Sequence, residues 1–298
     1  MGARSPAFAA SAWYTHPVSR LIVNADDFGL TPGINRAIAE LHAAGVVTSA
    51  TLMARASATA EAIEIARSTP TLGVGCHIVL LDGIPVLPPD RIPSLIDPRT
   101  GQFRTALSAF VPRLFTGKID SSEVEAEAAA QIASLQRSGL ELTHIDTHKH
   151  THMFLPVLRA VLRAARGLGI NKIRNPFEPA WAARATARAS LIRVAEITIL
   201  RRLRPACLRL VAEAGCATTD GTIAMAATGT LDAATLTSLI GRLEPGTWEL
   251  VTHPGYNDAD LDPVRTRLRE SRDQERNALA ALCHLPSLDL VSFRQIGL

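Results

Sequence analysis

Cysteine is scarce in this chain, and no two cysteines lie close together. The four are Cys76, Cys207, Cys216 and Cys283, with no CxxC pair among them. This spacing excludes a zinc finger. A chain of 298 residues also buries enough surface to fold without a disulfide framework. We therefore predict free thiols in a reducing compartment.

Long apolar runs and a strong charge imbalance are also missing. No segment reaches the roughly 18 consecutive apolar residues of a membrane-spanning helix. Residues 1–19 lack the sustained apolar core of a secretion signal, so we interpret them as a disordered lead-in and expect a cytoplasmic protein. The formal net charge of +3 is too small to indicate a nucleic-acid-binding protein.

Strand-like and helix-like segments alternate along the rest of the chain. Residues 21–25 (LIVNA) are apolar, as in a buried parallel strand, and residues 31–45 start with Thr31-Pro32 and end at Gly45, as helices do. The alternation predicts one α/β domain over residues 20–298, an irregular (β/α) TIM-like barrel of about seven strand–helix units. Further strands are expected at 46–53, 72–80, 143–148, 171–175, 248–253 and 289–293, and further helices at 57–68, 121–139, 155–168, 182–205, 232–242 and 264–282.

Ionisable side chains recur where the predicted strands end. In barrels of this kind the carboxyl ends of the strands meet on one face, which carries the chemistry. The proline-rich residues 82–105 form a long surface loop and a candidate lid over that face. The side chains at strand ends are Asp26, Asp27, His77, His148, Arg174 and His253.

The segment HIDTHKHTH, residues 144–152, is the densest group of potential ligands. If the strand persisted, its alternate residues would all line one face. Carboxylate and imidazole ligands at this spacing suit a divalent transition metal, and those outside the first shell would orient the others. A buried structural histidine is the alternative for any single one of them. The alternate residues are His144, Asp146, His148, His150 and His152.

Two adjacent aspartates, Asp26 and Asp27, follow the first strand. One of them could simply cap the next helix, but that explains only one. A metal explains both, because one carboxylate can bind it while the other acts as a base on the attacking water. The sequence permits either assignment of these two roles.

Four ordered motifs resemble the YdjC-like carbohydrate deacetylases, a family that includes chitooligosaccharide deacetylase. They are LIVNADDFGLTPGINRAI…GVVTSATLM, GVGCHIVLLDG…PVLPP, HIDTHKHTHMFLPV and THPGYND. The resemblance extends from about residue 20 to residue 297. Within the family, the chain is most similar to the hopanoid biosynthesis-associated branch, HpnK, in two stretches, LLDGIPVLPPDRIPSLIDPRTGQFR and HPGYNDADLDPVRTRLRESRDQER.

The resemblance implies an irregular barrel and a metal-dependent hydrolase that removes acetyl groups from N-acetylated sugars. Zinc is the expected ion, with magnesium as the alternative. Lys149 departs from the family, in which a second histidine often follows the ligand histidine. The roles implied are metal ligands for Asp27, His77 and His148, general base for Asp26, general acid for His253, orientation of the base for Arg174, and substrate binding or support for Asp146, His150, Tyr256 and Asp258.

The HpnK-like branch implies N-acetylglucosaminyl bacteriohopanetetrol as substrate. Soluble chitooligosaccharides are the close alternative, and a non-catalytic sugar- or metal-binding barrel is the alternative of another class. Residues 181–210 hold seven arginines and one acidic residue, interleaved with apolar side chains. Such a basic amphipathic segment can contact an anionic membrane peripherally, line an oligomer interface, or be an ordinary barrel helix.

Overall fold

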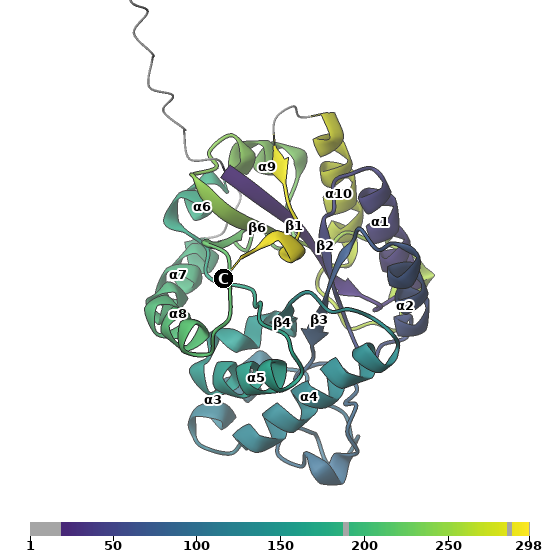
Figure 1. Ribbon diagram of the computed structural model, residues 1–298, viewed down its shortest axis with the longest axis vertical. Coiled ribbons are helices and arrows are strands. Elements are labelled where there is room, and N and C mark those ends of the chain that lie inside the picture. The colour runs from purple at the N-terminus through teal and green to yellow at the C-terminus, as the bar shows by residue number, and fades with distance from the viewer. Residues whose placement is uncertain (1–18, 187–190, 285–287, 298) are drawn as a thin grey trace, which may run out of the picture.

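The structure, a computed structural model, describes residues 19–186, 191–284 and 288–297. The predicted lead-in at residues 1–19 therefore lies almost wholly outside the described residues. Seven parallel strands form one curled sheet in the order β4-β3-β2-β1-β6-β5, and β7 pairs with β1. Helices surround this sheet (Figure 1). The predicted single-domain α/β barrel class is confirmed.

The element bounds are as follows. The strands are β1 (Ser19–Phe28), β2 (Ser49–Leu52), β3 (Gly73–Ile78), β4 (Ile145–Thr147), β5 (Gly221–Ile223), β6 (Gly246–Thr252) and β7 (Asp289–Leu290). The helices in the described residues are α1 (Pro32–Ala43), α2 (Thr59–Ser68), α3 (Leu107–Phe115), α4 (Ser121–Arg137), α5 (Leu155–Gly167), α6 (Ala180–Ala185), α7 (Leu191–Leu200), α8 (Arg204–Glu213), α9 (Ala233–Ile240) and α10 (Arg269–Ala280).

Two isolated β-bridges, and not a further strand, fill the space between β4 and β5. Residues 171–177 lie between these two strands, where Ile173 bridges Ile145 and Lys172 bridges Ala217, both in parallel. The strand predicted at residues 171–175 is wrong, because these bridges are isolated and do not form a continuous ladder. The segment nevertheless takes a strand's place beside β4, which positions Arg174 at the carboxyl end of the barrel.

The helices differ from the predictions in two places, and a proline lies in each. The one helix expected over residues 182–205 is instead α6, α7 and α8, and Pro205 lies in the first turn of α8. The sequence did not predict α3, which contains Pro112, a residue that ordinarily ends helices. It also missed β5, which is only three residues long.

The loop at residues 82–105 is hydrogen-bonded to α4 and to Lys149. Two of its backbone amides donate to the Glu127 carboxylate of α4 at 2.7 and 2.9 Å. Lys149 holds both ends of the loop, since its Nζ donates to Asp82 Oδ2 at 2.7 Å and to the Thr105 carbonyl at 3.2 Å. The loop is thus tied to the turn that follows His148, and its role as a lid stays a prediction.

An aromatic pair fills the amino end of the barrel. His144 stacks on Phe293 with ring centroids 3.7 Å apart, and both side chains are fully buried. Gly75 makes room for the imidazole, because a Cβ there would lie 2.5 Å from the ring. Burial lowers the pKa of His144 to about 3, so the ring is neutral. This end of the barrel is packed core and contributes no ligand to the site at the other end.

Candidate active site and metal centre

A bulge in β1 brings both aspartates into the site. Ala25 pairs with Ala50 and Phe28 with Leu52, so β1 uses one residue more than β2 over this stretch. Asp27 takes up the extra residue in a left-handed conformation, with φ of 65°. The predicted end of the strand at residue 25 is therefore wrong. The strand continues, and the bulge frees two neighbouring carboxylates from pointing to opposite faces.

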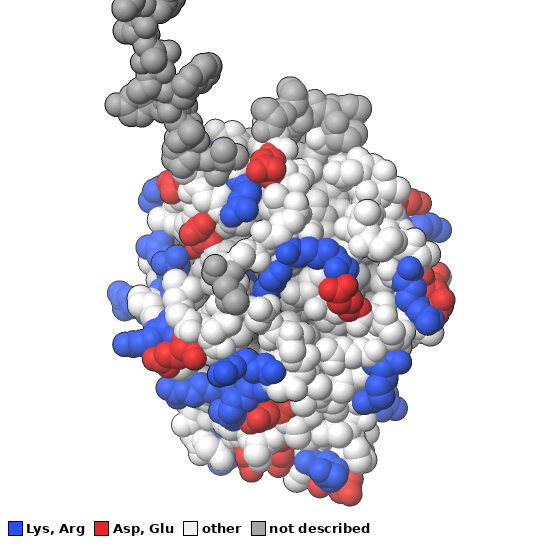
Figure 2. All heavy atoms as spheres, in the orientation of Figure 1, with Lys and Arg blue, Asp and Glu red and all other residues white. Residues whose placement is uncertain are grey.

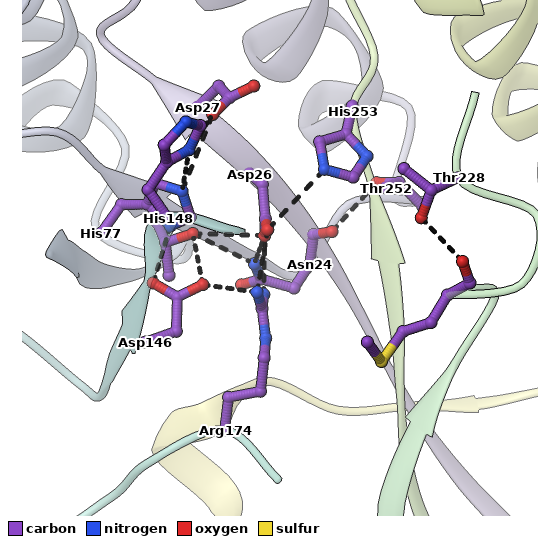
Figure 3. A network of polar contacts seen from close by, with 12 residues as sticks. Asn24, Asp26, Asp27, His77, Asp146, His148, Arg174, Thr228, Thr252 and His253 are labelled. Atoms are coloured by element: carbon purple, nitrogen blue, oxygen red, sulfur yellow. Dashed lines mark hydrogen bonds and ion pairs between the residues drawn. The ribbon is translucent and has the colours of Figure 1, made fainter. Parts of the chain in front are cut away.

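Asp27, His77 and His148 bring three potential ligand atoms together (Figure 3). Asp27 Oδ1 lies 3.7 Å from His77 Nε2 and 3.5 Å from His148 Nδ1, and the two nitrogens are 3.3 Å apart. Atoms that each lie about 2.0–2.1 Å from one tetrahedral ion are roughly 3.4 Å from one another. The spacing therefore fits one divalent cation, and the three residues form a candidate metal site.

Asp146 orients His77 within this site. Its Oδ1 lies 2.8 Å from His77 Nδ1, which leaves Nε2 directed at Asp27 and His148. Burial alone would lower the pKa of His77, but the carboxylates of Asp146, Asp26 and Asp27 prevail and raise it to about 9. Without a metal, the His77 ring is therefore doubly protonated and positively charged at neutral pH. Metal binding must displace one of these protons, so affinity should fall as the pH is lowered.

Arg174 lies at the centre of three buried carboxylates. It contacts both oxygens of Asp26 at 2.8 and 2.6 Å, Asp146 Oδ2 at 2.5 Å and Glu249 Oε1 at 2.7 Å. Burial alone would raise the pKa of Asp26, but the guanidinium holds it well below its usual range. At Glu249 burial prevails over Arg174, and the pKa rises to about 7. Asp26 is thus ionised throughout the neutral range.

His253 faces Asp26 from the end of β6. Its Nε2 lies 3.9 Å from Asp26 Oδ2, and its Nδ1 lies 3.7 Å from Glu275 Oε2, which also accepts the His253 backbone amide at 2.6 Å. Burial alone would lower the pKa of His253, but the carboxylates of Glu275, Asp26 and Asp27 raise it. An ionised carboxylate and an imidazole that favours its proton therefore stand opposite one another.

Three buried charges at the site were missed by the sequence reasoning. Arg272 and Glu275 come from α10, where charged residues usually face solvent. Their helical spacing was a usable signal, because it puts both on one face with the buried Leu279. Glu249 had a usable signal, because it is a charge inside the apolar strand WELVT and is fully buried.

The alternate residues of 144–152 do not line one face, which corrects that prediction. β4 ends at Thr147, and Lys149 and His150 then adopt left-handed φ of 55° and 52° in a turn. Only Asp146 and His148 reach the cluster. His152 is buried beside Thr147, with Nδ1 2.7 Å from the hydroxyl.

Three other predicted residues show no direct contact with the metal triad. His150 is half-buried, and burial lowers its pKa well below the usual value. Tyr256 lies between the guanidinium groups of Arg36 and Arg276, each 3.7 Å from its ring centroid. Asp258 begins a short helical turn, where its side chain accepts from the Asp260 amide.

Comparisons with known proteins identify relatives of this chain. A carbohydrate deacetylase from Brevibacillus brevis is 43% identical over 162 residues, which cover 54% of this chain and 60% of that protein. One from Thermoanaerobacter pseudethanolicus is 29% identical over 259 residues, covering 87% and 90%. The match thus spans about three fifths of the first relative and nearly all of the second.

The fold and the family are shown over most of the chain. A solved structure from Enterococcus faecalis, named for cellobiose-phosphate cleavage, has a TM-score of 0.69 at 29% identity, covering 93% of this chain and 98% of that one. The family described as YdjC-like protein matches residues 20–284. The chain belongs to the YdjC-like protein family.

Proposed function

We propose that this protein is a metal-dependent hydrolase that removes the acetyl group from an N-acetylated amino sugar. The observation that carries the proposal is the position of Asp26, an ionised carboxylate next to the triad of Asp27, His77 and His148 but bound to Arg174. A protein that only binds sugar or metal has no need for a held carboxylate there. The curated relatives named carbohydrate deacetylase support the same chemistry.

Two side chains divide the proton transfers in this proposal. When bound, a cation would act as a Lewis acid toward water and the acetyl oxygen. Asp26 accepts the proton of the attacking water, held in place by Arg174. His253 gives a proton to the sugar nitrogen, which must be protonated before it can leave. The lowered pKa of Asp26 and the raised pKa of His253 keep both groups in these states at the same pH.

Acetate release is the direct test. Purified protein is incubated with N-acetylglucosamine oligomers, with and without a chelator, and acetate and free amine are both quantified. Acetate equal to the amine formed, lost on chelation and regained with zinc, is expected; magnesium is the second ion to assay. Sugar binding without any acetate from either a soluble or a lipid-linked substrate would show a binding protein and overturn the proposal.

About one metal ion per chain is expected. A second group of potential ligands, Asp26, His77 and Asp146, lies beside the first. Arg174 contacts both carboxylates of that group and takes the place of a cation there. Elemental analysis after zinc loading and gel filtration should therefore give about one equivalent. Two tightly held equivalents would contradict this prediction.

Glu275→Gln should move the alkaline limb of the activity profile to lower pH. Glu275 contributes most among the carboxylates that raise the pKa of His253, so loss of its charge should lower that pKa. An opposite charge at this range shifts a pKa by about one unit or more. The measurement is kcat/KM against pH, with Glu270→Gln, an exposed carboxylate of the same helix, as control. An unchanged limb would rule out His253 as its origin.

We propose N-acetylglucosaminyl bacteriohopanetetrol as the substrate, with soluble chitooligosaccharides as the alternative. The supporting feature is α7, where Ile192 and Ile199 are 74% and 60% exposed on one side of the helix. Figure 2 shows Lys and Arg side chains gathered along the edge formed by α7 and α8. Exposed apolar residues beside cations suit the surface of an anionic membrane. In the described residues no helix is long and apolar enough to cross a membrane.

Vesicle binding separates the two substrates. Wild type should sediment with phosphatidylcholine vesicles that contain phosphatidylglycerol, and much less with phosphatidylcholine alone. Ile192→Ser with Ile199→Ser should lose this binding and the activity on lipid-linked substrate, while keeping its activity on soluble oligomers. Equal binding and activity of variant and wild type would leave the soluble substrate as the better assignment.

A further inference from the structure

Arg272 is a fully buried arginine that reaches the candidate metal site from α10. Its Nη2 donates to Asp27 Oδ2 at 2.6 Å, and its Nη1 lies 3.5 Å from the His253 carbonyl. Its Nε has no hydrogen-bond partner among the described residues. Burying a guanidinium costs several kcal/mol before it is paired. The main group that stabilises this buried guanidinium is one carboxylate oxygen, Asp27 Oδ2.

The two oxygens of Asp27 therefore have different partners. Oδ1 faces the two imidazole nitrogens at 3.7 and 3.5 Å, whereas Oδ2 is held by Arg272. A free carboxylate can bind a cation through both oxygens. With Oδ2 engaged by a guanidinium, only Oδ1 is available.

We propose that Arg272 is a positioning residue that restricts Asp27 to one ligand oxygen and weakens it as a ligand. The proposal rests on the proposed metal at Asp27, His77 and His148. The guanidinium draws negative charge away from the carboxylate and repels a cation, so the site binds metal less tightly than its ligands alone would allow. In return a bound ion would keep more of its positive charge available to the acetyl oxygen.

Gly255 offers a second substitution that tests the contact between Arg272 and Asp27. A Cβ at this position would lie 2.9 Å from Arg272 Cδ and 3.0 Å from Ile34 Cγ1. The glycine thus allows the arginine stem to pass close to the loop after β6. Gly255→Ala should displace Arg272 without changing any charge.

The test measures metal affinity and catalysis together. Zinc affinity is determined by competition with a chromophoric chelator, and kcat and KM by acetate release. For Arg272→Met we expect zinc to bind about tenfold more tightly and kcat to fall about 10- to 100-fold, with KM little changed. Arg272→Lys keeps the charge and should restore affinity to near the wild-type value. Gly255→Ala should change both quantities in the same directions as Arg272→Met, by smaller factors.

A purely structural role predicts the opposite sign. Loosening the site would weaken zinc binding in Arg272→Met, and that result, or an unchanged affinity, would overturn the inference. If Arg272→Met does not fold, Arg272→Lys and Gly255→Ala still test the proposal. Weaker zinc binding in Gly255→Ala would overturn it in the same way. Arg163→Met, which breaks a surface pair of the same 2.6 Å length with Glu125, is the matched control. Wild type that binds neither zinc nor magnesium would instead refute the proposed function.

Discussion

Asp26→Asn is expected to lower kcat by a factor of about 10² to 10⁴ while zinc binding stays close to that of wild type. Asparagine has nearly the same shape as aspartate but cannot accept the proton of the attacking water. Asp26 lies outside the triad of Asp27, His77 and His148, so the ligand set is untouched. The measurements are single-substrate kinetics by acetate release and the zinc dissociation constant of the same preparation.

The fold should tolerate this change. Arg174 would still contact Asp146 at 2.5 Å and Glu249 at 2.7 Å, so the buried guanidinium keeps two carboxylates. Asp90→Asn, at an exposed position, is a suitable control for the loss of one negative charge. Full activity with bound zinc would exclude Asp26 as the base. Loss of zinc in Asp26→Asn, together with zinc retention in Asp27→Asn, would show that the two aspartates exchange roles.

The convergence of the site could be predicted from the sequence because it follows from topology. Parallel strands all end at one edge, so ionisable residues at strand ends in β1, β3, β4 and β6 have to meet there. Seven predicted residues do come together in this way (Figure 3). They are Asp26, Asp27, His77, Asp146, His148, Arg174 and His253.

Local conformation was harder to predict. Alternation of residues in HIDTHKHTH is a strand pattern, yet the chain turns after Thr147 through two left-handed residues, Lys149 and His150. Left-handed non-glycine residues are uncommon. Asp and His are enriched among them, which fits Asp27 and His150 but not Lys149. The bulge in β1 likewise depends on a left-handed non-glycine residue, Asp27. In both places the backbone departs from the regular period at a ligand residue or directly after one, at Asp27 and after His148.

The partners that α10 supplies were not identified from the sequence, although Arg272, Glu275 and Leu279 share one face of that helix. Arg272 is 245 residues away from Asp27 in sequence, and α10 is otherwise rich in exposed charges. Only the docking of α10 on the barrel determines that Arg272 and Glu275 face inward. The barrel class itself needed no such information, because the alternation of strands and helices is enough to indicate it.

His148→Ala is expected to weaken zinc binding more than about 100-fold and to reduce activity to that of the chelated wild type. Removing an outer carboxylate or carbonyl that accepts a hydrogen bond from a ligand typically costs 10- to 100-fold in affinity. His148 is itself one of the three candidate ligands found in the described residues, so its loss should cost more. In the described residues its one carboxylate neighbour is Asp27, which keeps Arg272 as a partner, so its removal leaves no buried acid unpaired. Its side chain is 19% exposed, and we expect the metal-free stability to change by about 1 kcal/mol or less.

Thermal unfolding separates ligand loss from damage to the fold. A ligand that binds only the folded state stabilises it by about 2.7 kcal/mol at 100 times its Kd, so wild type should show a higher Tm in zinc. His148→Ala should match the metal-free Tm of wild type and show little zinc-dependent rise. His42→Gln, far from the triad near the start of β2, should keep the full rise. A variant with an unchanged zinc-dependent rise would remove His148 from the ligand set and leave Asp27 and His77, two ligands where a zinc site with an open position needs three.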